Sequence, residues 1–133
     1  MLREIKVGIE GKASTVVNKG NTAMAYGSGA VNVFATPAMV ALMEKAALSS
    51  VDPLLDAGYT TVGTKIEVKH MAATPMGMNV TATSRLVEVN GKRLLFNIEV
   101  KDEVDLVGTG VHERFIVELA GFIKRVEGKA ASK

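Results

Sequence analysis

The stretch "FATPAMVALMEKAALSS", residues 34–50, contains alanine, methionine, valine and leucine almost without interruption. It predicts one long helix, with Thr36 as N-cap and Pro37 at the first helical position, running to about Ser50. Apolar residues fall on nearly every side of this helix, so we expect most of its surface to be buried. One acid, Glu44, interrupts the pattern beside Lys45, and a carboxylate in such a helix calls for an explanation.

The rest of the chain alternates between apolar and polar residues, which is typical of half-buried strands. One strand is expected before the helix and four after it, over residues 12–18, 62–70, 78–89, 92–103 and 111–119. The alternation slips near Leu86–Val87, which indicates a β-bulge, and Asn90-Gly91 predicts a hairpin. A curved antiparallel sheet wrapped around one central helix accommodates this order. The expected class is therefore α+β with a hotdog-like layout.

The phase of the alternation predicts which side chains face the helix. On the strand over residues 62–70, the expected inner face includes Val62, Thr64, Ile66, Val68 and His70. On the strand over residues 92–103 it consists of Leu94, Phe96, Ile98 and Val100. On the last strand Phe115, Val117 and Leu119 form the expected apolar face, and His112 and Arg114 lie on an opposite, solvated face. "GTG" at 108–110 is expected to be a turn, and residues 122–133 a mobile tail. Residues 1–12 are expected to be a mobile lead-in with a possible short strand, and residues 24–32 a Gly-rich loop.

Composition limits the possible functions. The chain has 133 residues, which fits a single domain, and a net charge of +2, which gives no reason to expect a nucleic-acid partner. It has no cysteines, hence no disulfide and no thiolate metal site, and its two histidines lack metal-ligand spacing. The first residues lack the apolar core of a signal peptide, and no run is long enough to cross a bilayer. We expect a cytoplasmic protein without metal or redox cofactor.

Three residues are candidates for chemistry. Glu44 either marks a solvent-facing edge of the helix or faces a cleft, where apolar neighbours raise a carboxyl pKa and suit it to act as base or nucleophile. His70 is either a satisfied core residue or the partner of a nearby helix carboxylate. Thr36 is either a simple N-cap or a hydroxyl beside helix-start amides that can hold a developing oxyanion.

Three separated segments carry a family resemblance: "FATPAMVALME", "VGTKIEVKHMAATPMGMNVTAT" and "GTGVHERFIV". In this order they resemble the fluoroacetyl-CoA thioesterase family of hotdog-fold proteins, over about residues 14 to 120. The resemblance implies a catalytic group of Thr36, Glu44 and His70, and substrate contacts from Gly63 and Arg114. It also implies aromatic lid residues before the helix, but in the segment "YGSGAVN" at 26–32 the only aromatic candidate for such a lid is Tyr26.

The sequence thus predicts an acyl-CoA thioesterase that releases free acid and CoA from a short acyl-CoA, without preference for the fluorinated substrate. The alternative is a non-catalytic acyl-CoA-binding regulatory module. Free sheet edges and an incompletely covered helix favour a homodimer or higher oligomer. Thr36 and Glu44 lie about 12 Å apart along one helix. We therefore expect sites composed of Thr36 from one chain and Glu44 with His70 from the other.

Overall fold

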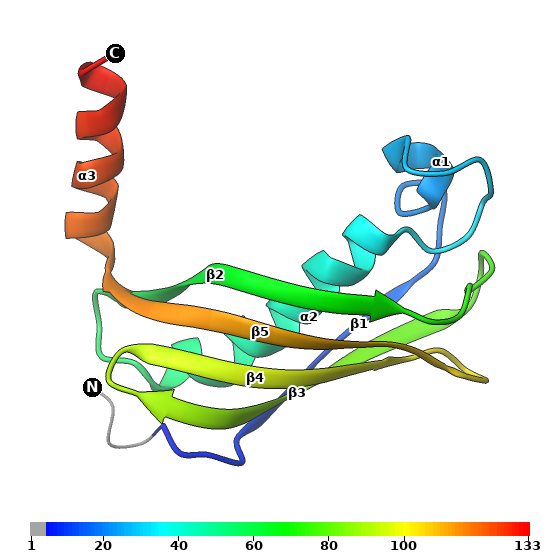
Figure 1. Ribbon diagram of the computed structural model, residues 1–133, viewed down its shortest axis with the longest axis horizontal. Helices are drawn as coiled ribbons and strands as arrows, with labels where there is room; N and C mark the ends of the chain where they lie inside the picture. The colour runs from blue at the N-terminus through cyan, green and yellow to red at the C-terminus, as the bar shows by residue number, and fades with distance from the viewer. Residues whose placement is uncertain (1–4) are drawn as a thin grey trace.

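The computed structural model describes residues 5–133 and contains one sheet, one long helix and two shorter helices (Figure 1). The strands are β1 (Glu10–Val16), β2 (Tyr59–His70), β3 (Asn79–Asn90), β4 (Arg93–Lys101) and β5 (Leu106–Glu118). All neighbours pair antiparallel, in the order β1-β3-β4-β5-β2. The predicted α+β class and hotdog layout are confirmed, and β1 and β2 are the two edge strands of the sheet. The lead-in expected over residues 1–12 overlaps residues 1–4, which lie outside the described part.

The helix α2 (Thr36–Val51) lies against one face of the curved sheet and forms the centre of the core (Figure 1). Its buried residues recur along its whole length: Ala38, Met39, Leu42, Met43, Ala46, Ala47 and Val51. They meet the inner face of β4, where the predicted set Leu94, Phe96, Ile98 and Val100 is buried without exception. The bulge predicted in β3 is confirmed as a register shift between Leu86 and Glu88.

The "GTG" segment is not a turn but the interior of β5. A Cβ built on Gly108 would lie 2.7 Å from Met39 Sδ, and one on Gly110 would lie 3.1 Å from Met43 Sδ. Two successive inward positions without side chains therefore leave the space that the methionines of α2 occupy. A Cβ on Gly108 would also lie 2.9 Å from the Lys69 carbonyl oxygen, so the close approach of the backbone favours glycine there.

The expected faces of β5 are inverted. His112 and Arg114 are buried, at 1% and 5% exposure, whereas Phe115 is 39% and Leu119 44% exposed. In β2 the expected phase holds for Ile66, Val68 and His70 but fails earlier, because the register shifts between Gly63 and Lys65. Before this bulge the buried residue is Thr61, and Thr64 instead hydrogen-bonds the Glu113 side chain.

Two short helices replace segments expected to be irregular. Residues of the expected Gly-rich loop form α1 (Ala23–Tyr26), one turn that is capped by the Thr22 side chain and closed by Gly27 at φ +69°. The expected tail is α3 (Leu119–Ala131), which projects away from the sheet beyond β2 (Figure 1). A 3-10 turn, η1 (Asp52–Leu54), ends α2 and brings Asp52 beside the start of β2.

Candidate active site

The predicted site residues fall into two groups at different points along α2. Thr36 and His70 form the first group, because His70 ends β2 next to the start of the helix. The Thr36 hydroxyl and His70 Nδ1 are 2.7 Å apart and hydrogen-bonded. Thr36 is therefore not the N-cap that the sequence predicts. That position belongs to Ala35, which has no side-chain capping bond, and the hydroxyl is used by the histidine instead.

The surroundings of His70 leave it poised for proton transfer. Burial lowers the pKa of its imidazole, so the ring is neutral at neutral pH. Its second nitrogen, Nε2, is buried and makes no hydrogen bond of good geometry within residues 5–133, although the backbone of Ala72 lies close to the ring and partly offsets the effect of burial on its pKa. Since buried polar atoms are usually paired, this ring nitrogen is available to water, a ligand or another chain.

The helix start beside this pair also offers backbone donors. Pro37 has no N–H, and no side chain among residues 5–133 caps the first turn, which leaves the amides of Thr36 and Ala38 without an acceptor. A hollow of about 590 Å³ opens here, lined mainly by small and apolar residues: Ala23, Ser28, Val33, Phe34, Thr36, Pro37, His70, Met71, Ala72 and Ala73. Tyr26, the one lid candidate, lines a different hollow and is 50% exposed.

Glu44 belongs to the second group, two turns further along α2. Its carboxylate lies over Gly63 of β2: a Cβ built there would be 2.8 Å from Glu44 Oε2, 3.2 Å from His112 Cε1 and 3.4 Å from Arg114 Nη1. The histidine near Glu44 within one chain is therefore His112, and the expected Glu44–His70 pair does not form. Glu44, Gly63 and Arg114, which the resemblance groups as site residues, do converge.

Sequence analysis missed His112, Thr61 and Asp52, which complete this second group. The Arg114 guanidinium donates from Nε to Thr61 Oγ1 at 2.8 Å and from Nη2 to the Thr61 carbonyl at 2.9 Å. Burial lowers the pKa values of both Arg114 and His112. A histidine and an arginine two residues apart on a strand share a face, and that spacing could have indicated that both belong to the site. The exposed Phe115 obscured it.

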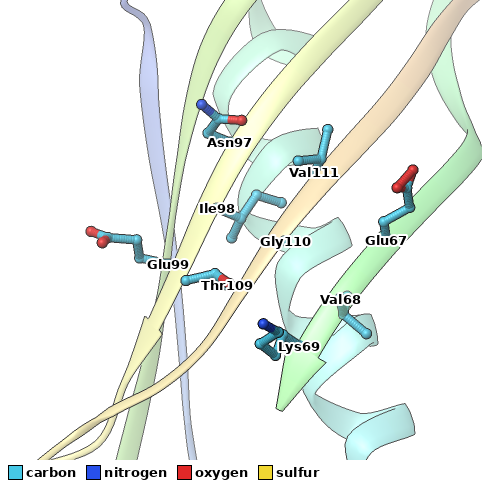
Figure 2. A pocket seen from close by; sticks show the side chains of 9 residues that line it. All are labelled: Glu67, Val68, Lys69, Asn97, Ile98, Glu99, Thr109, Gly110 and Val111. Atoms are coloured by element: carbon cyan, nitrogen blue, oxygen red, sulfur yellow. The ribbon is translucent and has the colours of Figure 1, made fainter. Parts of the chain in front are cut away.

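A separate hollow of about 440 Å³ lies on the outer face of the sheet, opposite α2 (Figure 2). Its side chains come from β2, β4 and β5 and include Glu67, Lys69, Glu99 and Val111. Thr109, Glu99 and Lys69 are cross-strand neighbours in this hollow, but no hydrogen bond joins their side chains within residues 5–133, whereas Thr36 and His70 are hydrogen-bonded on the inner face. Over residues 5–133 no helix is long and apolar enough to cross a membrane, and no cluster of three metal-ligating side chains occurs.

One long helix packed against one face of a five-stranded, curved antiparallel sheet defines the hotdog fold. A hotdog protein from Thermanaerovibrio acidaminovorans has a TM-score of 0.88 at 28% identity, covering 96% of each chain. A Thermus thermophilus protein described as a thioesterase superfamily member also has a TM-score of 0.88, at 29% identity, covering 98% of this chain and 99% of that one.

The chain belongs to the family of fluoroacetyl-CoA-specific thioesterases, whose family model matches residues 17–120. The fluoroacetyl-CoA thioesterase of Streptantibioticus cattleyicolor is 44% identical over 97 residues, which cover 73% of this chain and 70% of that protein. The crystal structure of a single-residue mutant of the fluoroacetyl-CoA-specific thioesterase has a TM-score of 0.87 at 38% identity, covering 94% of this chain and 97% of that one. The predicted family is confirmed.

Proposed function

We propose that the protein is an acyl-CoA thioesterase that hydrolyses a short acyl-CoA to a carboxylic acid and free CoA. Family membership supports this function, and the observation that carries it is the hydrogen bond between Thr36 and His70 at the uncapped start of α2. A hydroxyl, an imidazole with a free nitrogen and two backbone donors are the groups that a thioester carbonyl requires.

In this reaction the carbon–sulfur bond breaks and a carbon–oxygen bond to the acyl carbon forms. Glu44 either takes a proton from the attacking water or attacks the carbonyl carbon itself, giving an anhydride that water then opens. Thr36 and the amides at the start of α2 polarise the carbonyl oxygen. His70 stabilises charge and, as a neutral imidazole, relays a proton by accepting at one ring nitrogen and releasing from the other, so that the proton taken from water reaches the leaving thiolate. Side chains, water and the CoA substrate suffice, so no further cofactor enters the proposal.

A two-fold dimer assembles the site in this proposal. Thr36 and Glu44 are eight residues apart on α2, about 12 Å along its axis, so one chain cannot place both at one carbonyl. A second copy that pairs antiparallel along the free edge of β2 sets the two α2 helices side by side. Each site then combines Thr36 and His70 of one protomer with Glu44 of the partner subunit. This revises the expected composition, because His70 hydrogen-bonds Thr36 of its own chain.

Hydrolysis of an acyl-CoA panel, followed by free thiol release, tests the activity. We expect turnover of short acyl-CoA substrates and similar kcat/KM for acetyl-CoA and fluoroacetyl-CoA, because the small residues Gly27, Ser28, Gly29 and Ala30 occupy the segment in which the resemblance implies an aromatic lid. Small differences in a pocket are worth only about 1–3 kcal/mol in discrimination. A kcat/KM about 10³-fold or more higher for fluoroacetyl-CoA than for acetyl-CoA would contradict the expectation of a pocket without an aromatic lid. Saturable acyl-CoA binding without thiol release would instead identify the binding module.

Subunit exchange tests the composite site. Mixing impaired Thr36→Ala and Glu44→Gln homodimers should restore activity, because each mixed dimer then has one site with all residues intact. Mixing Thr36→Ala with His70→Ala should restore none, since both changes damage the same half-site. Exchange is verified with differently tagged chains. Rescue in the second mixture would favour the composition first expected from the sequence, and rescue in neither would place each site within one chain.

A further inference from the structure

The Arg114 guanidinium is buried without a carboxylate in contact. It is 5% exposed, and each of its three nitrogens is hydrogen-bonded within the chain. Across residues 5–133 it forms no ion pair within 4.0 Å. Its direct partners are all neutral, and Asp52 and Glu44 attract it only from a greater distance, so burial of this cation is costly and points to a role in the site.

Asp52 fixes one side of this arginine through Thr61. Its carboxylate accepts the Thr61 hydroxyl at 2.6 Å and the Thr61 amide at 3.3 Å. A threonine hydroxyl has a single proton, and here the proton is committed to Asp52. The oxygen of Thr61 is therefore left as an acceptor, and Arg114 Nε donates to it at 2.8 Å.

His112 fixes the other side. Its Nδ1 lies 2.8 Å from the Lys65 carbonyl, which can only accept, so the proton of the ring is on Nδ1. Nε2 is then unprotonated and accepts from Arg114 Nη1 at 3.1 Å. Burial lowers the pKa of His112 and keeps the ring in this neutral form. The imidazole is 1% exposed, which leaves it little freedom to turn.

The guanidinium held in this way lies close to Glu44. Both Glu44 Oε2 and Arg114 Nη1 lie near one point above Gly63, at 2.8 and 3.4 Å, so they are about 6 Å apart or less. An arginine has five N–H groups. Three are used in the bonds described, which leaves two without an acceptor among residues 5–133. An oxygen of a bound thioester can accept from them.

We propose that Asp52 and His112 are positioning residues that act through Arg114, holding its two free N–H groups toward a carbonyl oxygen of the bound acyl-CoA beside Glu44. The proposal rests on the thioesterase function proposed above. The resemblance marks Arg114 as a substrate contact; the dependence of its orientation on Asp52 and on one tautomer of His112 is the new element. Neither positioning residue touches the substrate itself.

Kinetics of paired variants test the coupling. We expect His112→Phe to lower kcat/KM about tenfold, because it removes the acceptor for Nη1, and His112→Gln to recover most of the loss through its amide oxygen. Asp52→Asn should lower it similarly. In an Arg114→Met background, His112→Phe should have no further effect. Full activity of a folded His112→Phe protein, or losses that multiply in the double variant, would overturn the proposal.

Two measurements keep the test independent of folding and of the proposed function. In the wild-type protein, ¹⁵N NMR of the imidazoles should show His112 protonated on Nδ1 and not on Nε2; the opposite tautomer would overturn the proposal. If the wild type hydrolyses no acyl-CoA, the proposed function fails. The same variants are then compared by affinity for a non-hydrolysable thioether analogue of acetyl-CoA. Weaker binding by His112→Phe, restored in His112→Gln, supports the positioning role, and unchanged affinity refutes it.

Discussion

Replacing Glu44 by glutamine is expected to lower kcat by about 10² or more while the protein remains folded, the scale for losing a positioned base. The amide keeps the shape of the side chain and lacks its charge and basicity. No hydrogen bond or ion pair to the Glu44 carboxylate exists within residues 5–133, and its charge attracts Arg114 and His112 only at longer range, so we expect the protein to fold without it. Initial rates of thiol release at saturating acyl-CoA, together with thermal unfolding, measure both effects.

The neighbouring charge provides a matched control. Lys45 occupies the next position on α2 and is exposed, whereas Glu44 is only partly exposed. Lys45→Gln removes one charge from the same turn of the helix and should leave kcat unchanged. If Glu44→Gln and Lys45→Gln behave alike, the carboxylate is no more than the solvent-facing edge of the helix, which was the simpler of the two interpretations open from the sequence.

Replacing Gly63 by alanine, which adds one methyl group, is expected to lower kcat/KM nearly as much as Glu44→Gln lowers kcat. The Cβ of Gly63→Ala would lie 2.8 Å from Glu44 Oε2, closer than van der Waals contact allows, so the carboxylate has to move. A displacement of about 1 Å in a catalytic group can cost about 10² in rate. The backbone of Gly63 does not have a positive φ, so alanine itself is not strained there. Steady-state kcat/KM with acetyl-CoA measures the loss.

Two further variants show whether the methyl group acts through Glu44. Gly128→Ala, at a glycine of α3 with no atom within 4 Å of the new Cβ, controls for the general effect of replacing glycine and should keep full activity. In the Glu44→Gln background, Gly63→Ala should cost little more, since the group that it displaces is already inactive. Independent, multiplying losses would show that Gly63 acts on the substrate by another route.

Local periodicity was enough to predict the scaffold. The helix over residues 37–50 extends by one residue at each end, and the inner face of β4 is as expected, because both signals come from apolar residues at regular spacing. The bulge in β3 was visible as a slip in that spacing. The bulge in β2 was not visible, since Gly63 and Thr64 are neither clearly apolar nor clearly polar.

The site was predicted less well than the scaffold, for a physical reason. Burial of His112 and Arg114 depends on hydrogen bonds to Lys65 and Thr61, 47 and 53 residues away in sequence. The alternation of apolar and polar residues within one strand does not reveal such distant partners. The apolar Phe115 therefore predicted the wrong face. The same holds for Thr36, whose capping role was the local expectation and whose actual partner, His70, is 34 residues distant.

The free edge of β2 has a consequence for solubility. A long unpaired edge strand is a template on which foreign strands, and ultimately aggregates, can grow. Here the register shift between Gly63 and Lys65 interrupts the edge, and Lys65, Glu67 and Lys69 place alternating charges along it. Such an edge discourages indiscriminate pairing but can still accept a strand of complementary charge, as an antiparallel copy of itself would offer. The strand that supplies Gly63 and His70 to the site is thereby also protected against misassembly.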